Sequence, residues 1–259
     1  MSPIHASYFT DPACPRSWGA EPSLRRLMVE FGEGVEITYV MSGLAREFGA
    51  PESLVAEWLD VAEASGMPVD PRLWLASPPR SSYPACMAVK AASEQGLAAP
   101  YLRRLREGLA CGRRKLDHAE AFMAEARAQT GMNVDRFEID LGSHAIMESF
   151  GADLERTRGG ERGTAPVSAP LLRFAAAAGS VHEVSAAEPY ESWRAAAIAA
   201  GASPAGNGTP EVEEALQRWE ARERSLTDHT QARAAELART RALGSGMHWD
   251  DVGLRAALH

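Results

Sequence analysis

The order of strand-like and helix-like stretches along the 259 residues constrains the fold more than any other feature. Residues 4–10, "IHASYFT", and residues 35–42, "VEITYVMS", alternate and are rich in β-forming side chains, which is typical of strands. From residue 44 to about 160 the apolar residues follow helical spacing instead. Strand patterns return only at 168–176 and 180–186. This order predicts one small mixed sheet whose strands are separated in sequence by a long helical insertion.

A helix is expected between the first two strands. Pro15 suits its first position, and Pro22, inside the helix, is expected to kink it. The residues that share its apolar face are Leu24, Leu27, Met28 and Phe31. A strand–helix–strand connection of this kind predicts two parallel, neighbouring strands.

Glycine, proline and serine divide the rest of the chain into further helices. Those expected in the helical block are residues 51–65, 84–95, 98–112, 117–130 and 143–157. A helix at 189–200 follows the last strand, and "GASPAGNGTP" (201–210) has the composition of a linker. The helices expected beyond the linker are residues 210–224, 228–243 and 247–258.

We therefore expect an α/β chain of three parts. Residues 1–43 and 161–200 together form the sheet unit, and residues 44–160 form the helical insertion subdomain. Residues 201–259 form the linker and a C-terminal helical extension, whose arginines are offset by interleaved glutamates. That balance favours a helical cap on the sheet unit over direct DNA binding.

Charge and cysteine content exclude several classes of protein. The net charge of −8, from 27 basic and 35 acidic side chains, predicts no affinity for nucleic acid or an anionic membrane. No apolar run approaches the roughly 20 residues that span a bilayer, and "MSPIHASYFTD" lacks the features of a signal peptide, so we expect a cytoplasmic protein. The three cysteines, Cys14, Cys86 and Cys111, predict neither a disulfide framework nor a metal site.

Cys14 lies where the first strand gives way to a helix. The amino end of a helix favours a thiolate, and Arg16 adds a positive charge, so we expect the pKa of Cys14 to be lower than that of a free thiol. Asp11 opposes this effect, and Ser17, one helical turn on, can point its hydroxyl at the sulfur. The alternative is that Cys14 is a small buried apolar residue.

Three stretches carry a resemblance to a known family: "TDPACPRSWGAEP", "PPRSSYPACMAVKAASEQG" and "APVSAPLLRF". Over about residues 5–200 the chain resembles DsbA-like thioredoxin-fold proteins with a helical insertion. It is most similar to the cytoplasmic branch of FrnE-type dithiol oxidoreductases, hydroxychromene carboxylate isomerases and adaptors that present substrates to Clp proteases. We expect no tightly bound cofactor, and a low-molecular-weight thiol is a candidate co-substrate.

The resemblance implies roles for individual residues. It implies a catalytic set of Cys14, Ser17 and Pro170, in which Pro170 is cis and faces the cysteine. The residues expected to contact a substrate or thiol are Pro15, Arg16, Trp18, Ser82 and Ala169, with Ala169 pairing through its backbone. Cys86 is a possible resolving thiol, although buried filling of the insertion is the alternative for Cys86, and helix capping or packing for Ser82.

Ser17 is a departure, because active dithiol members of the family carry cysteine at this position. One sulfur can form a mixed disulfide but cannot resolve it alone. Three functions therefore stay open: a monothiol thiol–disulfide oxidoreductase or isomerase, an adaptor with a redox-sensing or idle cysteine, and a thiol-dependent small-molecule isomerase. The third is disfavoured, because those isomerases usually have serine in place of Cys14. We weigh an enzyme ahead of an adaptor, with a protein thiol, a disulfide or a small thiol as its partner.

Overall fold

The computed structural model describes residues 3–159, 166–176 and 179–204, together with four isolated helical residues, Glu214, Gln217, Arg218 and Ala221. Those four fall within the helix predicted at 210–224. The helices predicted at 228–243 and 247–258 lie outside the described residues. No helix in the described ranges is both long and apolar enough to cross a membrane.

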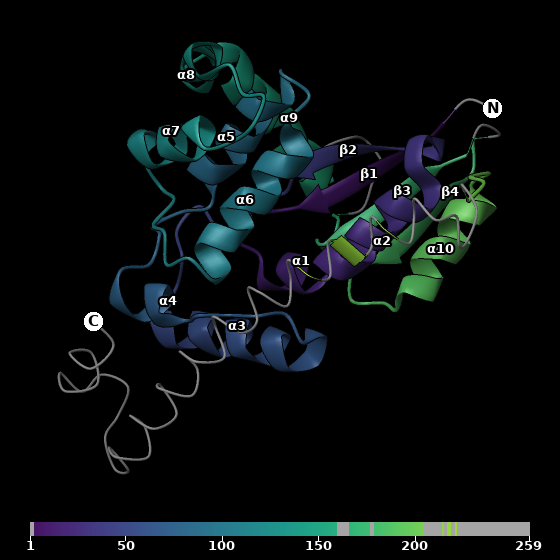
Figure 1. Ribbon diagram of the computed structural model, residues 1–259, viewed down its shortest axis with the longest axis horizontal. Helices are drawn as coiled ribbons and strands as arrows, with labels where there is room; N and C mark the ends of the chain where they lie inside the picture. The colour runs from purple at the N-terminus through teal and green to yellow at the C-terminus, as the bar shows by residue number, and fades with distance from the viewer. Residues whose placement is uncertain are drawn as a thin grey trace.

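The predicted sheet is confirmed. It contains β1 (Ile4–Thr10), β2 (Val35–Met41), β3 (Leu171–Ala175) and β4 (Val181–Ser185) in the order β2-β1-β3-β4 (Figure 1). β1 and β2 are parallel, as a crossover through helices requires, and the other two pairings are antiparallel.

Helices fill the chain between β2 and β3, and no strand interrupts the described part of this insertion, residues 44–159. Its helices are α3 (Pro51–Ser65), α4 (Arg72–Ala76), α5 (Tyr83–Ser93), α6 (Ala98–Ala110), α7 (Ala119–Arg127), α8 (Val134–Leu141) and α9 (His144–Arg158). The other helices are α1 (Pro15–Gly19), α2 (Glu21–Phe31), the single 3-10 turn η1 (Gly32–Gly34) and α10 (Tyr190–Ala199).

The sequence prediction of one kinked helix after β1 is wrong. The chain forms two helices, α1 and α2, that meet at Ala20. Pro22 does not kink a helix interior; it lies in the first turn of α2, where its missing N–H costs nothing. The sequence analysis also missed α4 and α8, which are short.

The buried apolar residues form two cores, one on the sheet and one in the insertion. In Figure 1, α5 and α9 of the insertion lie beside β2, and α10 lies beside β4 at the opposite edge of the sheet. One core packs α2 and α10 against the strands and includes Leu27 and Trp193, while the other fills the insertion and includes Trp58 and Trp74. The loop that carries Cys14 leads from β1 into α1, whose Trp18 packs in the insertion core.

Candidate thiol site at Cys14

Cys14 is the N-cap residue of α1, directly before Pro15. Its backbone is extended, with φ −81° and ψ 117°, and its sulfur accepts a hydrogen bond from the Ser17 backbone N–H at 3.4 Å. Asp11 fixes the turn before it, because the Ala13 N–H donates to Asp11 Oδ1 at 2.8 Å. Cys14 is a free thiol, and only 4% of it is exposed. The sulfur therefore sits at a helix start, as expected, but beneath the surface.

The prediction that the pKa of Cys14 is lowered is wrong. Burial raises the pKa of this thiol, and the charge of Asp11 raises it further, while hydrogen bonds from Ser17 and the charge of Arg106 lower it without reversing the direction. The helix that was expected to acidify the thiol has only five residues. Arg16 points away: its side chain is 60% exposed and lies 3.7 Å from Glu57.

A buried arginine from the insertion takes the place that Arg16 was expected to fill. Arg106, on α6, is fully buried, and it ion-pairs with Glu21 and donates from Nη2 to Thr10 Oγ1. Thr10 donates to Ser17 Oγ at 2.9 Å, and the Ser17 backbone N–H donates to the Cys14 sulfur. We call Arg106, Thr10 and Ser17 the Arg106 relay. The sequence analysis identified Ser17 but missed Thr10 and Arg106.

The buried Asp11 carboxylate joins the Cys14 loop to the insertion through several hydrogen bonds. Its Oδ2 accepts hydrogen bonds from the Leu44 N–H at 2.7 Å, Ser82 Oγ at 2.8 Å and Cys86 Sγ at 3.2 Å. Burial raises the pKa of Asp11, and these hydrogen bonds oppose that rise. Ser82 thus faces Asp11 in the interior, which is a structural position and not a wall of an open pocket.

Cys86 has the surroundings of a neutral thiol. It is fully buried, and burial together with the charge of Asp11 raises the pKa of Cys86 well above its ordinary value. Its thiol donates to Asp11, so deprotonation would place two negative charges side by side. The structure thus supplies a reason why Cys86 forms little thiolate.

Pro170 lies at the end of the sheet from which the Cys14 loop emerges. The Ala169–Pro170 peptide bond is cis, which is the isomer that the family resemblance implies. Phe9 pairs with Leu171, so the start of β3 and the end of β1 lie at the same end of the sheet. Pro170 is buried and Ala169 is partly buried, and the Pro170 carbonyl accepts a hydrogen bond from the Ala186 N–H at 3.0 Å.

Two other residues of the predicted site are inside the protein. Pro15 is buried in the first turn of α1, and Trp18 is fully buried. The Trp18 ring N–H donates to the Pro68 carbonyl at 2.9 Å, and the Arg103 guanidinium lies 4.5 Å from the centre of the Trp18 ring. These contacts give Trp18 a packing role in this structure.

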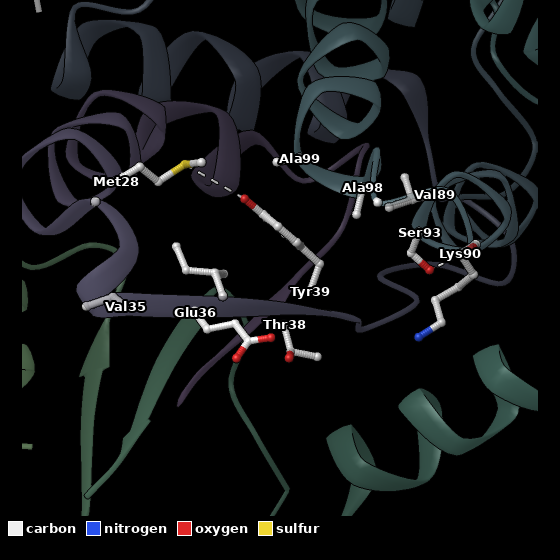
Figure 2. Close-up of a pocket in the computed structure, with 13 residues that line it drawn as sticks. Met28, Val35, Glu36, Thr38, Tyr39, Val89, Lys90, Ser93, Ala98 and Ala99 are labelled. Atoms are coloured by element: carbon white, nitrogen blue, oxygen red, sulfur yellow. Dashed lines mark hydrogen bonds between the residues drawn. The ribbon is translucent and has the colours of Figure 1, made fainter. Parts of the chain in front are cut away.

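Two cavities formed by the described residues do not include Cys14 in their lining. One, of about 480 Å³, runs along β2; Figure 2 shows Tyr39 reaching across it towards Met28, and none of the predicted site residues lines it. A second, of about 600 Å³, is lined by Arg46, Glu47, Arg80, Ser81, Pro84 and Asp117. Within the described ranges no cluster of His, Cys, Asp or Glu side chains could hold a metal ion.

Comparison with known proteins identifies the family. Residues 8–166 match the sequence model of a family described as Thioredoxin, which is more than half of the chain. The chain belongs to this thioredoxin family, and its fold is DsbA-like. A tightly bound cofactor is not typical of DsbA-like proteins.

Among curated proteins, this DsbA-like chain is similar to the ClpXP adapter protein SpxH of Halalkalibacterium halodurans, with 31% identity over 168 residues, 60% of this chain and 55% of that protein. SpxH of Bacillus subtilis is 29% identical over 160 residues, 59% of this chain and 53% of that protein. The match therefore spans little more than half the length of these relatives.

Solved structures share the DsbA-like fold at low identity. A putative protein disulfide isomerase from Nitrosomonas europaea superimposes with a TM-score of 0.65 at 17% identity, over 76% of this chain and 97% of that chain. The cytosolic disulfide reductase DsbM from Pseudomonas aeruginosa superimposes with a TM-score of 0.61 at 21% identity, over 74% of this chain and 95% of that chain. DsbM has also been solved with GSH.

Proposed function

We propose that this protein carries out thiol–disulfide exchange through Cys14 as a single reactive sulfur, an activity of monothiol type. The observation that supports the proposal most is the set of donors on the sulfur. The Cys14 sulfur accepts a hydrogen bond from the Ser17 backbone N–H at the start of α1, and the Ser17 side chain also acts to lower the pKa of this thiol. Both effects of Ser17 favour the thiolate, which is the form that attacks a disulfide.

The exchange takes place in two steps. The Cys14 thiol loses its proton to solvent, and the thiolate attacks one sulfur of a disulfide; a mixed disulfide forms, the original S–S bond breaks, and the other sulfur leaves as a thiolate. A second thiolate then attacks the mixed disulfide, which forms a new disulfide and releases the Cys14 thiolate. Ser17 has no sulfur, so this second thiolate comes from another molecule.

A low-molecular-weight thiol suits the second step better than Cys86 does. Cys86 is buried, donates its proton to Asp11 and has a pKa well above the ordinary value, so it supplies little thiolate near neutral pH. We therefore assign the resolving role to a small thiol in solution and a structural role to Cys86.

An adaptor without enzymatic activity is the second candidate. The relatives with about 30% identity are named ClpXP adapter proteins, and the buried Cys14 with its raised pKa is a slow nucleophile at neutral pH. In this case Cys14 would sense oxidants or be idle, and a surface outside the thiol site would bind the partner protein. The cytoplasmic location, the division into three parts and the absence of nucleic-acid partners remain predictions.

Reaction with oxidised glutathione tests the proposal. Intact mass spectrometry is expected to show one glutathione on Cys14 in the wild type and none on that position in Cys14→Ser, with a rate that increases with pH because the pKa is raised. Insulin reduction is expected only when a small thiol is present. Ser17→Cys, which creates the dithiol spacing, is expected to form a closed disulfide.

Two results would overturn the monothiol mechanism. One is efficient turnover without added thiol by both the wild type and Cys86→Ala. The other is an absence of exchange in a protein whose Cys14 is still alkylated, which would favour the adaptor.

A further inference from the structure

We propose that Arg106 is a positioning residue of the Cys14 site, which acts through Thr10 and Ser17 to direct a hydroxyl hydrogen bond at the sulfur. The inference rests on Cys14 being the reactive group of the proposed function. It goes beyond that function because it assigns the control of thiol reactivity to a residue of the helical insertion.

The position of Arg106 is fixed from both sides. Its Nη1 contacts Glu21 on α2, and its Nη2 donates to Thr10 at the end of β1. No part of Arg106 is exposed, and its guanidinium lies 5.8 Å from the centre of the Tyr8 ring. Arg103 also pairs with Glu21, at 3.2 Å, so this carboxylate keeps a cation when Arg106 is replaced.

The direction of the hydrogen bonds follows from what each group can donate. A guanidinium has donors only, so it occupies an acceptor position of Thr10 Oγ1. The single hydroxyl hydrogen of Thr10 then goes to Ser17 Oγ, at 2.9 Å. Ser17 Oγ is thereby an acceptor from Thr10, which leaves its own hydrogen available to point at Cys14, the direction in which Ser17 lowers the pKa of that thiol. Without Arg106 the two hydroxyls could turn the other way, with Ser17 donating to Thr10.

The direction in which the Ser17 hydroxyl points affects the pKa of Cys14, because the thiol is buried and has little water to stabilise its charge. A hydroxyl that donates to the sulfur stabilises the thiolate, whereas one that accepts from the thiol stabilises the neutral form. The titratable and charged groups that interact with Cys14 are Asp11 in the same loop, Tyr8 on β1 and Arg106 on α6. Among these, Arg106 is the group that favours the thiolate, both by its charge and through the relay.

The rate of Cys14 alkylation by iodoacetamide, measured against pH on the full chain, tests the inference. Thr10→Val removes the hydroxyl but keeps the shape, and it is expected to lower the rate at pH 7 by about 3- to 10-fold and to move the pH midpoint upward. Thr10→Ser keeps the hydroxyl and is expected to stay close to the wild-type profile. Arg106→Met is expected to shift the midpoint at least as far as Thr10→Val does.

Arg103→Met is the matched control for Arg106→Met. It removes the other arginine paired with Glu21 without touching Thr10, so its midpoint is expected to match that of the wild type. Equal midpoints for Thr10→Val and Thr10→Ser would overturn the inference, as would an Arg103→Met shift as large as that of Arg106→Met. If Arg106→Met does not fold, the two Thr10 variants still decide.

The alkylation profile also separates this inference from the proposed function. Alkylation reports the acidity of the thiol whether or not the protein exchanges with disulfides. If the protein does not exchange with glutathione but the variants shift the pH midpoint of Cys14 alkylation as expected, the proposed function is wrong and the role of the Arg106 relay is supported. If the protein does exchange with glutathione but the variants leave the alkylation midpoint unchanged, the proposed function is supported and the role of the relay is wrong.

Discussion

The pKa of Cys14 results from opposing effects of burial and of the side chains close to it. Burial and the charge of Asp11 raise the pKa of the thiol, while hydrogen bonds from Ser17 and the charge of Arg106 lower it. The Asp11 carboxylate is held close to Cys14, because it accepts hydrogen bonds from Ala13, Leu44 and Ser82. Its carboxylate holds the loop in place and at the same time reduces the reactivity of the thiol.

Asp11→Asn is expected to make Cys14 more acidic, because the amide has nearly the same volume but no negative charge. The pH midpoint of Cys14 alkylation should fall by about one unit, the size of shift typical of a nearby charge. Measurement of alkylation against pH on the folded variant checks this expectation.

Asp153→Asn is the control for Asp11→Asn. Asp153 is also a buried carboxylate; it accepts from the Met41 N–H at 2.9 Å and lies 2.9 Å from Lys90. Asp153 is not among the main causes that shift the pKa of Cys14, so the midpoint should stay in place. An unchanged midpoint in Asp11→Asn would contradict the role given to Asp11.

The sequence predicted the contact between Cys14 and Ser17 but not the residue of the insertion that acts on them. Cys14 and Ser17 are close along the chain, so the spacing of a helical turn predicts their contact. Arg106 comes from a helix far along the chain, and only tertiary packing brings it to Thr10. The direction of the pKa shift was wrong for the same reason, because the spacing of residues does not reveal how deeply a sulfur is buried.

At the scale of elements, the turn after β2 depends on one glycine. Gly43 has a φ of +60°, and a Cβ added there would lie 2.5 Å from Leu154 Cδ2 and 3.0 Å from Tyr83 Cε1. Residues with a side chain are strained at such a φ, and the space is already filled. This turn leads to Leu44, whose N–H donates to Asp11, so its shape bears on the thiol site.

Gly43→Ala is therefore expected to destabilise the protein by about 1–3 kcal/mol, measured by urea denaturation. Gly151→Ala is the matched control, because Gly151 lies inside α9 and a Cβ there would meet nothing within 4 Å. Alanine at that position is expected to stabilise by about 0.5–1 kcal/mol through helix propensity. Equal effects of the two substitutions would contradict this account of the turn.

Local signals explain which helices the sequence predicted well. The bounds of α3 were predicted correctly, since Pro51 opens it and Gly66, with a φ of +71°, closes it. The break between α1 and α2 was missed because the apolar spacing of α2 carries no mark of a stop at Ala20. The five residues of α4 are too few for a period to show.

At the scale of the whole molecule, the insertion is joined to the sheet unit by buried polar contacts. Arg106 on α6 pairs with Glu21 on α2, and Asp153 on α9 accepts from the N–H of Met41, the last residue of β2. Breaking one partner of a buried pair is costly, because the other charge stays in the interior. The insertion is thus coupled to the site electrostatically as well as by packing.

The interruption of the sheet by this insertion has a consequence for how the chain folds. β1 meets β2 through a short crossover, but its pairing with β3 joins Phe9 to Leu171 across the whole insertion. Closing so long a loop costs chain entropy, and contacts distant in sequence form late for this reason. In pulse-labelling hydrogen exchange during refolding, the amides of β2 should be protected before those of β3, and the reverse order would contradict this. In a nascent chain that emerges from a ribosome, one side of β1 would then stay unpaired until β3, which ends at Ala175, is available.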